Sequence, residues 1–280
     1  MLTLLSPAKK LDFSPAPAQL QWSEPALWDD AQPLLKCLRS TSVDDLKSLM
    51  KISDSLATLN YQRHVALSDA LTVNNSKQAA LTFAGDVCWG LDPTTLQSGD
   101  WNWAQDKMVF LSGLFGVLRP LDGIQAYRLE MGTRIKNPRG ANLYEYWGPT
   151  VTDRLNEMTS QHNERTIINL ASQEYSKVVR RSSLNSQMIT IGFKEIRPQG
   201  PKTIGVVAKR SRGKFARWLI KNRVEKLQEL KQFDIDDYRF DSTLSSEDNW
   251  IFSRVDVPGR MQQEFQARKN RDQVTISASH

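Results

Sequence analysis

The sequence predicts a mixed α/β fold, of the α+β kind, in a single compact domain. Short apolar runs typical of buried strands alternate along the chain with longer segments whose apolar residues recur at helical spacing. The composition of the 280 residues, 40% apolar and 24% charged, is that of a globular protein with a sizeable core. The chain has no internal repeat. We therefore expect one domain over residues 1–258 and a loose polar tail over residues 259–280.

The first part of the chain predicts one strand and two helical segments. The run LTLL at residues 2–5 has the pattern of a buried strand, and Ser6-Pro7 ends it. The proline-rich residues 14–25 predict irregular chain on the surface. Helical spacing follows over residues 24–40 and 41–65, and the second segment opens with a Ser/Thr-x-x-Asp capping signature.

The rest of the chain predicts an alternation of strands and helices. Residues 79–92 have the pattern of a strand that passes into a glycine turn, and residues 98–118 that of a helix leading into a strand or hairpin. The buried strand at residues 166–171 precedes a helix that begins at Ser172, with Glu174 in its first turn. Helical spacing also covers residues 142–161 and 211–233, and strand patterns cover residues 187–196, 202–209 and both ends of 237–255.

The composition excludes several classes of site. Cys37 and Cys88 are far apart and form no Cys-x-x-Cys pair, which argues against a disulfide framework or a zinc ribbon. The histidines His64, His162 and His280 stand apart from one another, so we expect no metal site. The sequence contains no phosphate-binding loop, dinucleotide fingerprint or catalytic triad order, and we expect no cofactor.

The ends and the charge of the chain point to a cytoplasmic protein with an anionic partner. The N-terminus, MLTLLSPAKKLDF, has no basic region before its short apolar run, and no run approaches the roughly 20 apolar residues that span a bilayer. We therefore expect neither secretion nor membrane insertion. The net charge of +6 favours polyanion partners.

A run of cations at residues 209–223 is the clearest electrostatic feature of the sequence. It contains no acidic residue. On a helix, Arg210, Lys214, Arg217 and Lys221 would form one stripe, and an apolar stripe would dock the helix with the basic face outward. Such a stripe could neutralise several phosphates. The alternative is a solvated face that nearby carboxylates satisfy.

Glycines and charged residues mark the stretch FLSGLFGVLRPLDGIQAYRLEMG at residues 110–132. Gly113 and Gly116 are compatible with a hairpin between two helices whose amide groups grip a phosphate, and equally with tight packing of the backbone. Arg128 and Glu130 would lie on the same side of an extended segment, where they form either a structural ion pair or part of a site.

Two predicted strand ends place further polar residues where ligands bind in α/β sheets. The loop SPAKK follows the strand at residues 2–5, and the loop that begins at Ser172 follows the strand at residues 166–171. Carboxyl ends of parallel strands share one edge of the sheet, so Lys9, Ser172, Glu174 and Tyr175 could line one pocket. There Lys9 could bind an anion, and a carboxylate or a tyrosine could act in acid/base chemistry. Alternatively, these residues only cap a helix and close a turn.

Six segments, spread in order from residue 6 to about residue 255, resemble the YaaA family of bacterial peroxide-stress proteins. They read SPAKKLDF, FAGDVCWGL, LSGLFGVLRPLDGIQAYRLEMG, NLYEYWG, INLASQEY and AKRSRGKFARWLIKNR. The resemblance implies a cytoplasmic protein that helps cells to survive hydrogen peroxide and limits unincorporated iron and oxidative DNA damage. It also implies a compact α/β domain of unusual topology, a basic cleft, and a helix-hairpin-helix-like element with DNA binding.

The resemblance assigns roles to particular residues of this chain. Gly113 and Gly116 would belong to the hairpin, and the cations that could line the cleft are Lys9, Arg119, Arg128, Lys209, Arg212 and Arg217. The chain departs from the family pattern at Lys10, which stands where a threonine is usual, and at Ala126, which stands where a proline is usual. Two residues separate the hairpin glycines, where the common DNA-binding form has one. The family pattern does not cover the tail after residue 259.

Two functions of different classes follow as hypotheses. The first is DNA binding, mostly without sequence specificity, by a protein that we expect to be a monomer; its residues are Lys9, Gly113, Gly116, Arg119, Arg128, Lys209, Arg210, Arg212, Lys214, Arg217 and Lys221. The second is an enzyme that acts on a nucleotide or another small anion, with a pocket of Lys9, Arg128, Glu130, Ser172, Glu174 and Tyr175. The scarcity of His and Cys argues against a dedicated iron site.

Overall fold

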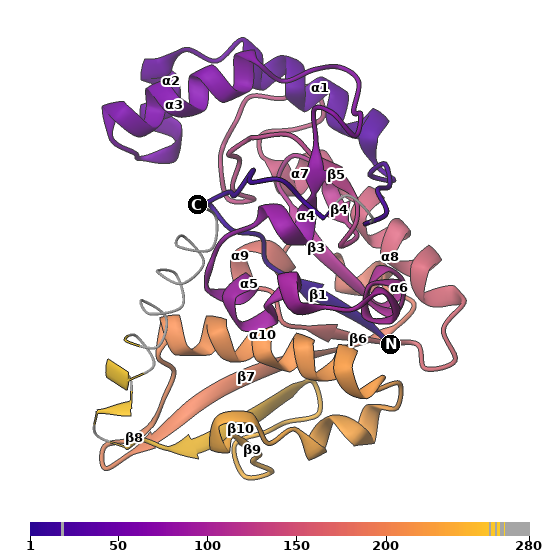
Figure 1. The fold of residues 1–280 in the computed structure, drawn as a ribbon, viewed down its shortest axis with the longest axis vertical. Helices are drawn as coiled ribbons and strands as arrows, with labels where there is room; N and C mark the ends of the chain where they lie inside the picture. The colour runs from indigo at the N-terminus through magenta and orange to yellow at the C-terminus, as the bar shows by residue number, and fades with distance from the viewer. Residues whose placement is uncertain (18–19, 258, 261, 264–265, 267–280) are drawn as a thin grey trace.

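An eight-stranded, mostly parallel sheet forms the centre of the computed structural model (Figure 1). The structure describes residues 1–17, 20–257, 259–260, 262–263 and 266. The strand order is β4-β3-β1-β6-β7-β10-β9, and β8 pairs with β7. Only β4, β8 and β9 run antiparallel to their neighbours. The strands are β1 (Leu2–Leu5), β3 (Met108–Ser112), β4 (Gly116–Leu118), β6 (Thr166–Asn169), β7 (Gln187–Arg197), β8 (Gly200–Lys202), β9 (Arg239–Phe240) and β10 (Asn249–Val255), and a separate small sheet pairs β2 (Lys77–Gln78) with β5 (Gly123–Ile124).

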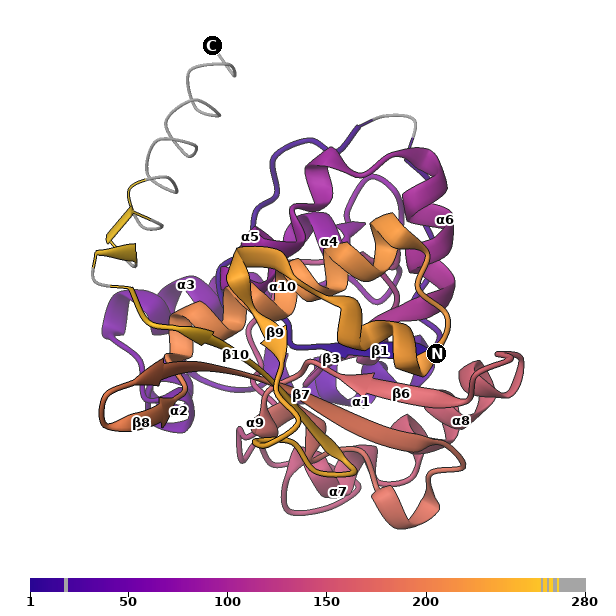
Figure 2. The ribbon, with the colours of Figure 1, turned by 90° about the horizontal axis from the view of Figure 1, so that it is seen from below.

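Helices cover both faces of this sheet. In Figure 2, α10, α5 and α6 lie on one face, and α7 and α8 lie on the other. The α-helices are α1 (Trp28–Arg39), α2 (Val43–Met50), α3 (Asp54–Val65), α4 (Ala79–Thr82), α5 (Asp86–Leu91), α6 (Ser98–Lys107), α7 (Leu143–Trp147), α8 (Thr150–Ser160), α9 (Gln173–Ser176) and α10 (Gly205–Asn222). Short 3-10 turns are η1 (Pro93–Thr95), η2 (Arg181–Ser183), η3 (Leu227–Gln232) and η4 (Ile235–Asp237).

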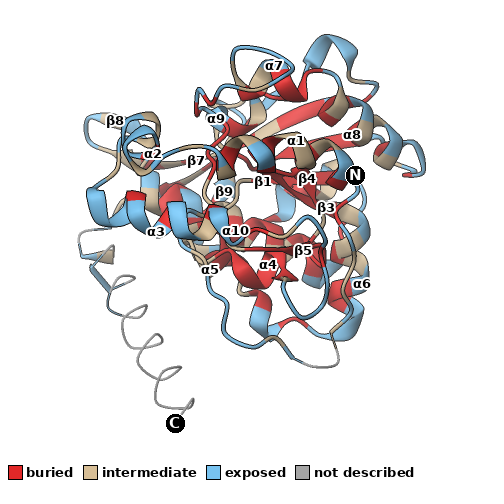
Figure 3. Cartoon of the chain, turned by 90° about the horizontal axis from the view of Figure 1, so that it is seen from above, coloured by how far each residue is buried: buried red, intermediate tan, exposed pale blue. Residues whose placement is uncertain are grey.

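One continuous hydrophobic core joins the two layers of helices to the sheet. It runs from Met1 to Phe252 along the sequence, and Figure 3 shows its buried residues gathered around the central strands. Between α10 and the sheet, Phe193, Phe215 and Phe252 pack ring against ring with centroids 5.3 to 6.1 Å apart. The described residues therefore form a single compact α+β domain, as predicted. The expected boundary at residue 258 lies outside the described residues, as does most of the 259–280 tail.

Several local signals act as the sequence predicts. The four residues of β1 are buried, and the side chain of Ser42 accepts a hydrogen bond from the amide of Asp45 at the start of α2. Ser172 is the N-cap of α9, and Glu174 lies in its first turn. The predicted helix and hairpin at residues 98–118 form α6, β3 and β4.

Two predicted strands are wrong. Residues 79–92 form α4 and α5: the extended conformation of Phe83 ends α4, and the extended Gly85 is the N-cap from which α5 begins at Asp86. In residues 202–209, β8 ends at Lys202 and α10 begins at Gly205. The branched side chains there suit a strand, but burial of Val207 within α10 outweighs that weak preference. The predicted long helix ends at Asn222, because Arg223 takes a left-handed conformation.

The backbones of α5 and α10 cross in direct contact. The crossing joins Gly90 of α5 to Gly213 of α10. A methyl group at Gly213 would overlap the carbonyl oxygen of Val87 and lie 2.8 Å from the amide nitrogen of Leu91. The two glycines thus have a packing role that allows α10 to lie deep in the fold.

Candidate functional site

The loops that follow β1 and β6 meet at the carboxyl edge of the sheet, as the sequence predicts. The amide of Ser172 donates a hydrogen bond of 2.8 Å to Oγ of Ser6, and the two hydroxyl oxygens lie 3.4 Å apart. The parallel pairing of β1 with β6 brings these ends together. The segment SPAKK is thereby held against the start of α9, and Lys9 extends from it.

Lys9, Arg128 and Glu130 form one charged cluster at this edge. The Lys9 Nζ lies 3.1 Å from Glu130 Oε1, and Arg128 donates to the same oxygen from Nη2 at 2.8 Å and from Nε at 3.2 Å. The Lys9 side chain is 64% exposed, whereas Glu130 is buried. The cluster borders a cavity of about 20 Å³ that is lined by Pro7, Ala8, Lys9, Tyr127, Arg128, Leu129, Glu130 and Tyr175.

Helix α3 adds a third cation and a buried histidine to the cluster. The amide of Arg128 donates to Nε2 of His64 at 3.3 Å, which ties α3 to the strand segment that carries Arg128. Burial, followed by repulsion from Arg128, lowers the pKa of Arg63. Lys9 and Arg128 therefore pair with the carboxylate of Glu130, and Arg63 lies close enough to Arg128 for their charges to repel.

Two tyrosines close the floor of the cavity as neutral groups. The hydroxyl of Tyr127 and that of Ser112 lie 2.7 Å apart. Burial raises the pKa of Tyr127 and that of Tyr175 far above physiological pH, so both remain protonated. Neither can act as a base at neutral pH in this arrangement.

Two residues of the predicted pocket lie beside the cavity rather than in its wall. Glu174 is exposed, and its Oε1 accepts a hydrogen bond of 3.1 Å from the amide of Gly132. Ser172 is the N-cap residue of α9, and its amide donates a hydrogen bond to Ser6. The structure thus brings together Lys9, Arg128, Glu130 and Tyr175, and gives Ser172 and Glu174 contacts that stabilise the surrounding loops.

The basic stripe of α10 is paired within the protein: Arg210 is buried, Lys214 and Arg217 are half-buried, and only Lys221 of the four is exposed. Carboxylates satisfy much of the stripe, which is the second of the two alternatives above, without its full exposure to solvent. The Arg210 side chain is 3% exposed; its Nε lies 3.2 Å from Asp86 Oδ1 and its guanidinium 4.8 Å from the Trp89 ring centre. Arg217 donates to the carbonyl oxygens of Leu91 and Asp92 at 3.0 and 2.9 Å. The crossing of α10 over α5 turns this face toward the acceptors of α5.

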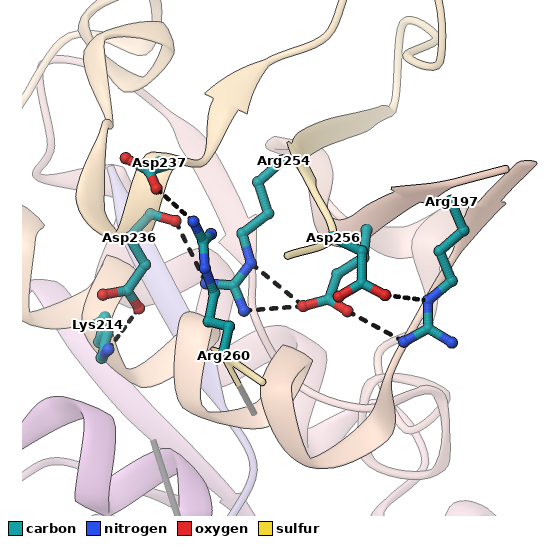
Figure 4. Close-up of polar contacts among 8 residues, drawn as sticks. Arg197, Lys214, Asp236, Asp237, Arg254, Asp256 and Arg260 are labelled. Atoms are coloured by element: carbon teal, nitrogen blue, oxygen red, sulfur yellow. Dashed lines mark hydrogen bonds and ion pairs between the residues drawn. The ribbon is translucent and has the colours of Figure 1, made fainter. Parts of the chain in front are cut away.

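The remaining stripe residues are paired in the same way. Lys214 forms an ion pair with Asp236, and Figure 4 shows this pair beside the contacts of Arg254 and Arg260 with η4. Lys221 pairs with Asp100. Outside the stripe, Lys209 is exposed, and Arg212 is half-buried, with a pKa that burial lowers. Four of the predicted DNA contacts therefore have partners within the protein.

Three more predicted DNA-binding residues lie in or just after the hairpin of β3 and β4, where Gly113 packs against the backbone of Leu129 and Glu130. Gly113 and Gly116 sit in the turn between the strands β3 and β4, and not between helices. Both are buried, and Gly116 adopts a φ of +65° against the ring of Trp147, so their role is packing. Arg119 follows β4, which returns toward the start of β3, and its Nη2 pairs with buried Asp122 at 3.3 Å.

The structure contains a helical hairpin that the glycine pattern did not indicate. Helices α2 and α3 pack on each other and are joined by Lys51, Ile52 and Ser53. Lys51 adopts the left-handed conformation at the end of α2, and the Ser53 side chain caps α3 by accepting from the amide of Leu56. The two serine caps are signals in the sequence that could have located this hairpin. No sequence signal links Arg63 and His64 to the Lys9 cluster, because only the packing of α3 brings them there.

The described residues offer few groups for metal binding or for thiol chemistry. Within the described ranges, no three His, Cys, Asp or Glu side chains are placed to hold a metal ion. Burial raises the pKa of Cys88 to about 12, which leaves its thiol protonated. Of the helices in that part of the chain, none combines the length and apolar character needed to cross a membrane.

The fold and the site define a class: compact α+β proteins with a cation-rich cluster at the strand ends and a helical hairpin beside it. The family model described as peroxide stress protein YaaA matches residues 1–244, and the chain belongs to that family. Its role is therefore in the peroxide stress response. It is 47% identical over 254 residues to a UPF0246 protein of Chromobacterium violaceum, and the match covers 91% of this chain and 99% of the relative. UPF0246 proteins of Colwellia psychrerythraea and Caulobacter vibrioides are 42% and 44% identical, with the same coverage of each chain.

Proposed function

We propose that this protein binds DNA in the cytoplasm, mostly without sequence specificity, and thereby limits iron-dependent oxidative damage to DNA during peroxide stress. The observation that carries the proposal is the Lys9 cluster, in which Lys9 and Arg128 share the carboxylate of Glu130 and Arg63 lies near Arg128. This excess of positive charge suits the phosphate backbone. The contacts available are to phosphates rather than to base edges, which accounts for the expected lack of sequence preference.

The α2–α3 hairpin supports the same function. The first amide groups of a helix have no partner within the helix; in α3, which follows the short turn that Lys51 opens, the Ser53 side chain accepts from the amide of Leu56 and leaves the amides of Asp54 and Ser55 for a phosphate. Helix α3 has 12 residues and so extends about 18 Å from this turn toward His64, or about five nucleotide steps along one strand. A strand held at the turn would therefore reach the Lys9 cluster within a few nucleotides.

Neutralising cations of the cluster should weaken DNA binding and reduce its dependence on salt. We expect Lys9→Gln and Arg63→Gln each to lower the slope of log K against log salt by about 0.9, since each removes about one phosphate contact. The measurement is fluorescence anisotropy with unrelated duplex sequences at several salt concentrations.

Two control variants separate contact from folding. Lys36→Gln removes an exposed cation of α1 and should leave the slope unchanged. Arg217→Met should lower the melting temperature through its lost carbonyl contacts and leave the slope near that of the wild type. If Arg217→Met changes the slope of log K against log salt and Lys9→Gln does not, DNA contacts α10 and not the Lys9 cluster, which would contradict the proposal.

The alternative function, an enzyme acting on a nucleotide or another small anion in a Lys9/Arg128/Glu174 pocket, draws on the same edge of the sheet. The cavity of about 20 Å³ has room for one water-sized group, not for a base or a sugar. A small substrate would have to lie outside it, against the exposed side of Lys9. We therefore favour DNA binding.

A further inference from the structure

The carboxylate at the centre of the Lys9 cluster uses only one of its two oxygens. Glu130 Oε1 accepts from Lys9 and Arg128, whereas Oε2 is buried and has no hydrogen-bond partner among the described residues. The whole residue is 8% exposed. A buried carboxylate oxygen only accepts hydrogen bonds, and leaving it without a donor is unfavourable. A water or a ligand hydroxyl beside Glu130 would supply the missing donor.

The surroundings restrict what this donor can be. The hydroxyl of Tyr127, in the wall of the same cavity, is already engaged with Ser112. The cavity of about 20 Å³ that Glu130 helps to line has room for a small group such as a water or a hydroxyl. Lys9 and Arg128, which also line the cavity, supply the positive charge beside it, with Arg63 near Arg128. The site therefore suits a ligand that presents a phosphate to the cations and a hydroxyl to Glu130.

We propose that the Lys9 cluster recognises a phosphate with a free sugar hydroxyl beside it, the chemistry found at the 3′ end of a DNA strand in a nick or gap. This inference rests on the proposed DNA binding and adds a substrate class to it. Within an unbroken DNA strand, the sugar and phosphate oxygens are all acceptors, so an interior position cannot serve Glu130. A strand end differs from the interior by the donor that Glu130 lacks.

The decisive experiment compares three small DNA circles of identical sequence with the full-length protein. One circle is closed, one has a nick with a 3′-hydroxyl, and one has the same nick with a 3′-deoxy end. We expect the 3′-hydroxyl nick to bind roughly tenfold more tightly than the 3′-deoxy nick, because a hydrogen bond to a carboxylate is lost. The 3′-deoxy nick should bind like the closed circle, apart from effects of flexibility.

Variants assign the preference to Glu130. Glu130→Ala should remove the difference between the two nicks, and Glu174→Ala, which changes an exposed carboxylate at the same edge of the sheet, should keep it. If Glu130→Ala fails to fold, the affinities of the wild-type protein for the two nicked circles still test whether it recognises the 3′-hydroxyl. Equal affinity for those circles overturns the inference and leaves salt-dependent DNA binding intact. Salt-independent or absent binding to all three circles overturns the proposed function itself.

Free nucleotides also carry a phosphate and a sugar hydroxyl. A competition experiment therefore distinguishes a DNA strand end from a free nucleotide as the ligand. A deoxynucleoside 5′-monophosphate carries both groups, and its 3′-deoxy analogue lacks the hydroxyl. We expect neither to displace nicked DNA at micromolar concentration, because neither reaches the α2–α3 hairpin. Displacement by the first and not by the second would make a nucleotide the ligand. Tighter binding of duplex RNA than of nicked DNA would assign the hydroxyl to the 2′ position, and either result would overturn the strand-end proposal.

Discussion

Replacing Gly213 with alanine should lower the free energy of unfolding by about 3 kcal/mol or more. The added methyl group would overlap the backbone of Val87 and Leu91 in α5, and backbone atoms cannot rotate away as a side chain can. The helices would have to separate, which would also pull Arg210 and Arg217 from their acceptors. Chemical denaturation monitored by tryptophan fluorescence and far-UV circular dichroism would measure the loss.

Gly205→Ala is the matched control within the same helix. Gly205 is the first residue of α10, and a methyl group there would meet no atom of the described structure within 4 Å. Alanine favours the helix, so we expect unchanged or slightly higher stability. Equal stability of the Gly213→Ala variant and the wild type would show that α10 does not cross α5 at this glycine.

The stability of the protein should fall by about 3 kcal/mol between pH 6.5 and pH 4 through His64 alone. Burial lowers the pKa of this fully buried histidine from 6.5 to about 4. In that range the unfolded chain binds a proton at His64 and the folded chain does not. The contribution of neutral His64 to the free energy of unfolding is therefore fully present above pH 6.5 and is lost progressively as the pH falls toward 4.

Comparing His64→Gln with the wild type isolates this contribution from the other acidic and basic groups. The glutamine side-chain oxygen can still accept the hydrogen bond from the amide of Arg128, but it does not titrate. Unfolding free energies measured in denaturant at half-unit steps should converge, or change order, as the pH falls from 7 to 4. Parallel curves for the two proteins would show that His64 is not held neutral in the folded state.

Much of the fold could be predicted from local signals. The buried strand β1, the cap at Ser42 and the helix start after Ser172 form where the sequence indicates them, because hydrophobic pattern and capping act over a few residues. The strand predictions for residues 79–92 and 202–209 were wrong because packing between distant segments decides the structure there. Their strand preference is weak, and the packing of α5 and α10 outweighs it.

The site divides in the same way. The sequence by itself determined that Lys9 would follow a strand, and that the ends of β1 and β6 would meet at one edge of a sheet, since parallel strands align their ends. Only the tertiary structure decided which cations face outward. The stripe of α10 turns inward because two glycines let α10 approach the acceptors of α5, whereas α3 carries Arg63 to the Lys9 cluster from a distant part of the chain. Helical spacing shows which residues share a face, but the neighbour that a face meets depends on contacts between segments far apart in the sequence.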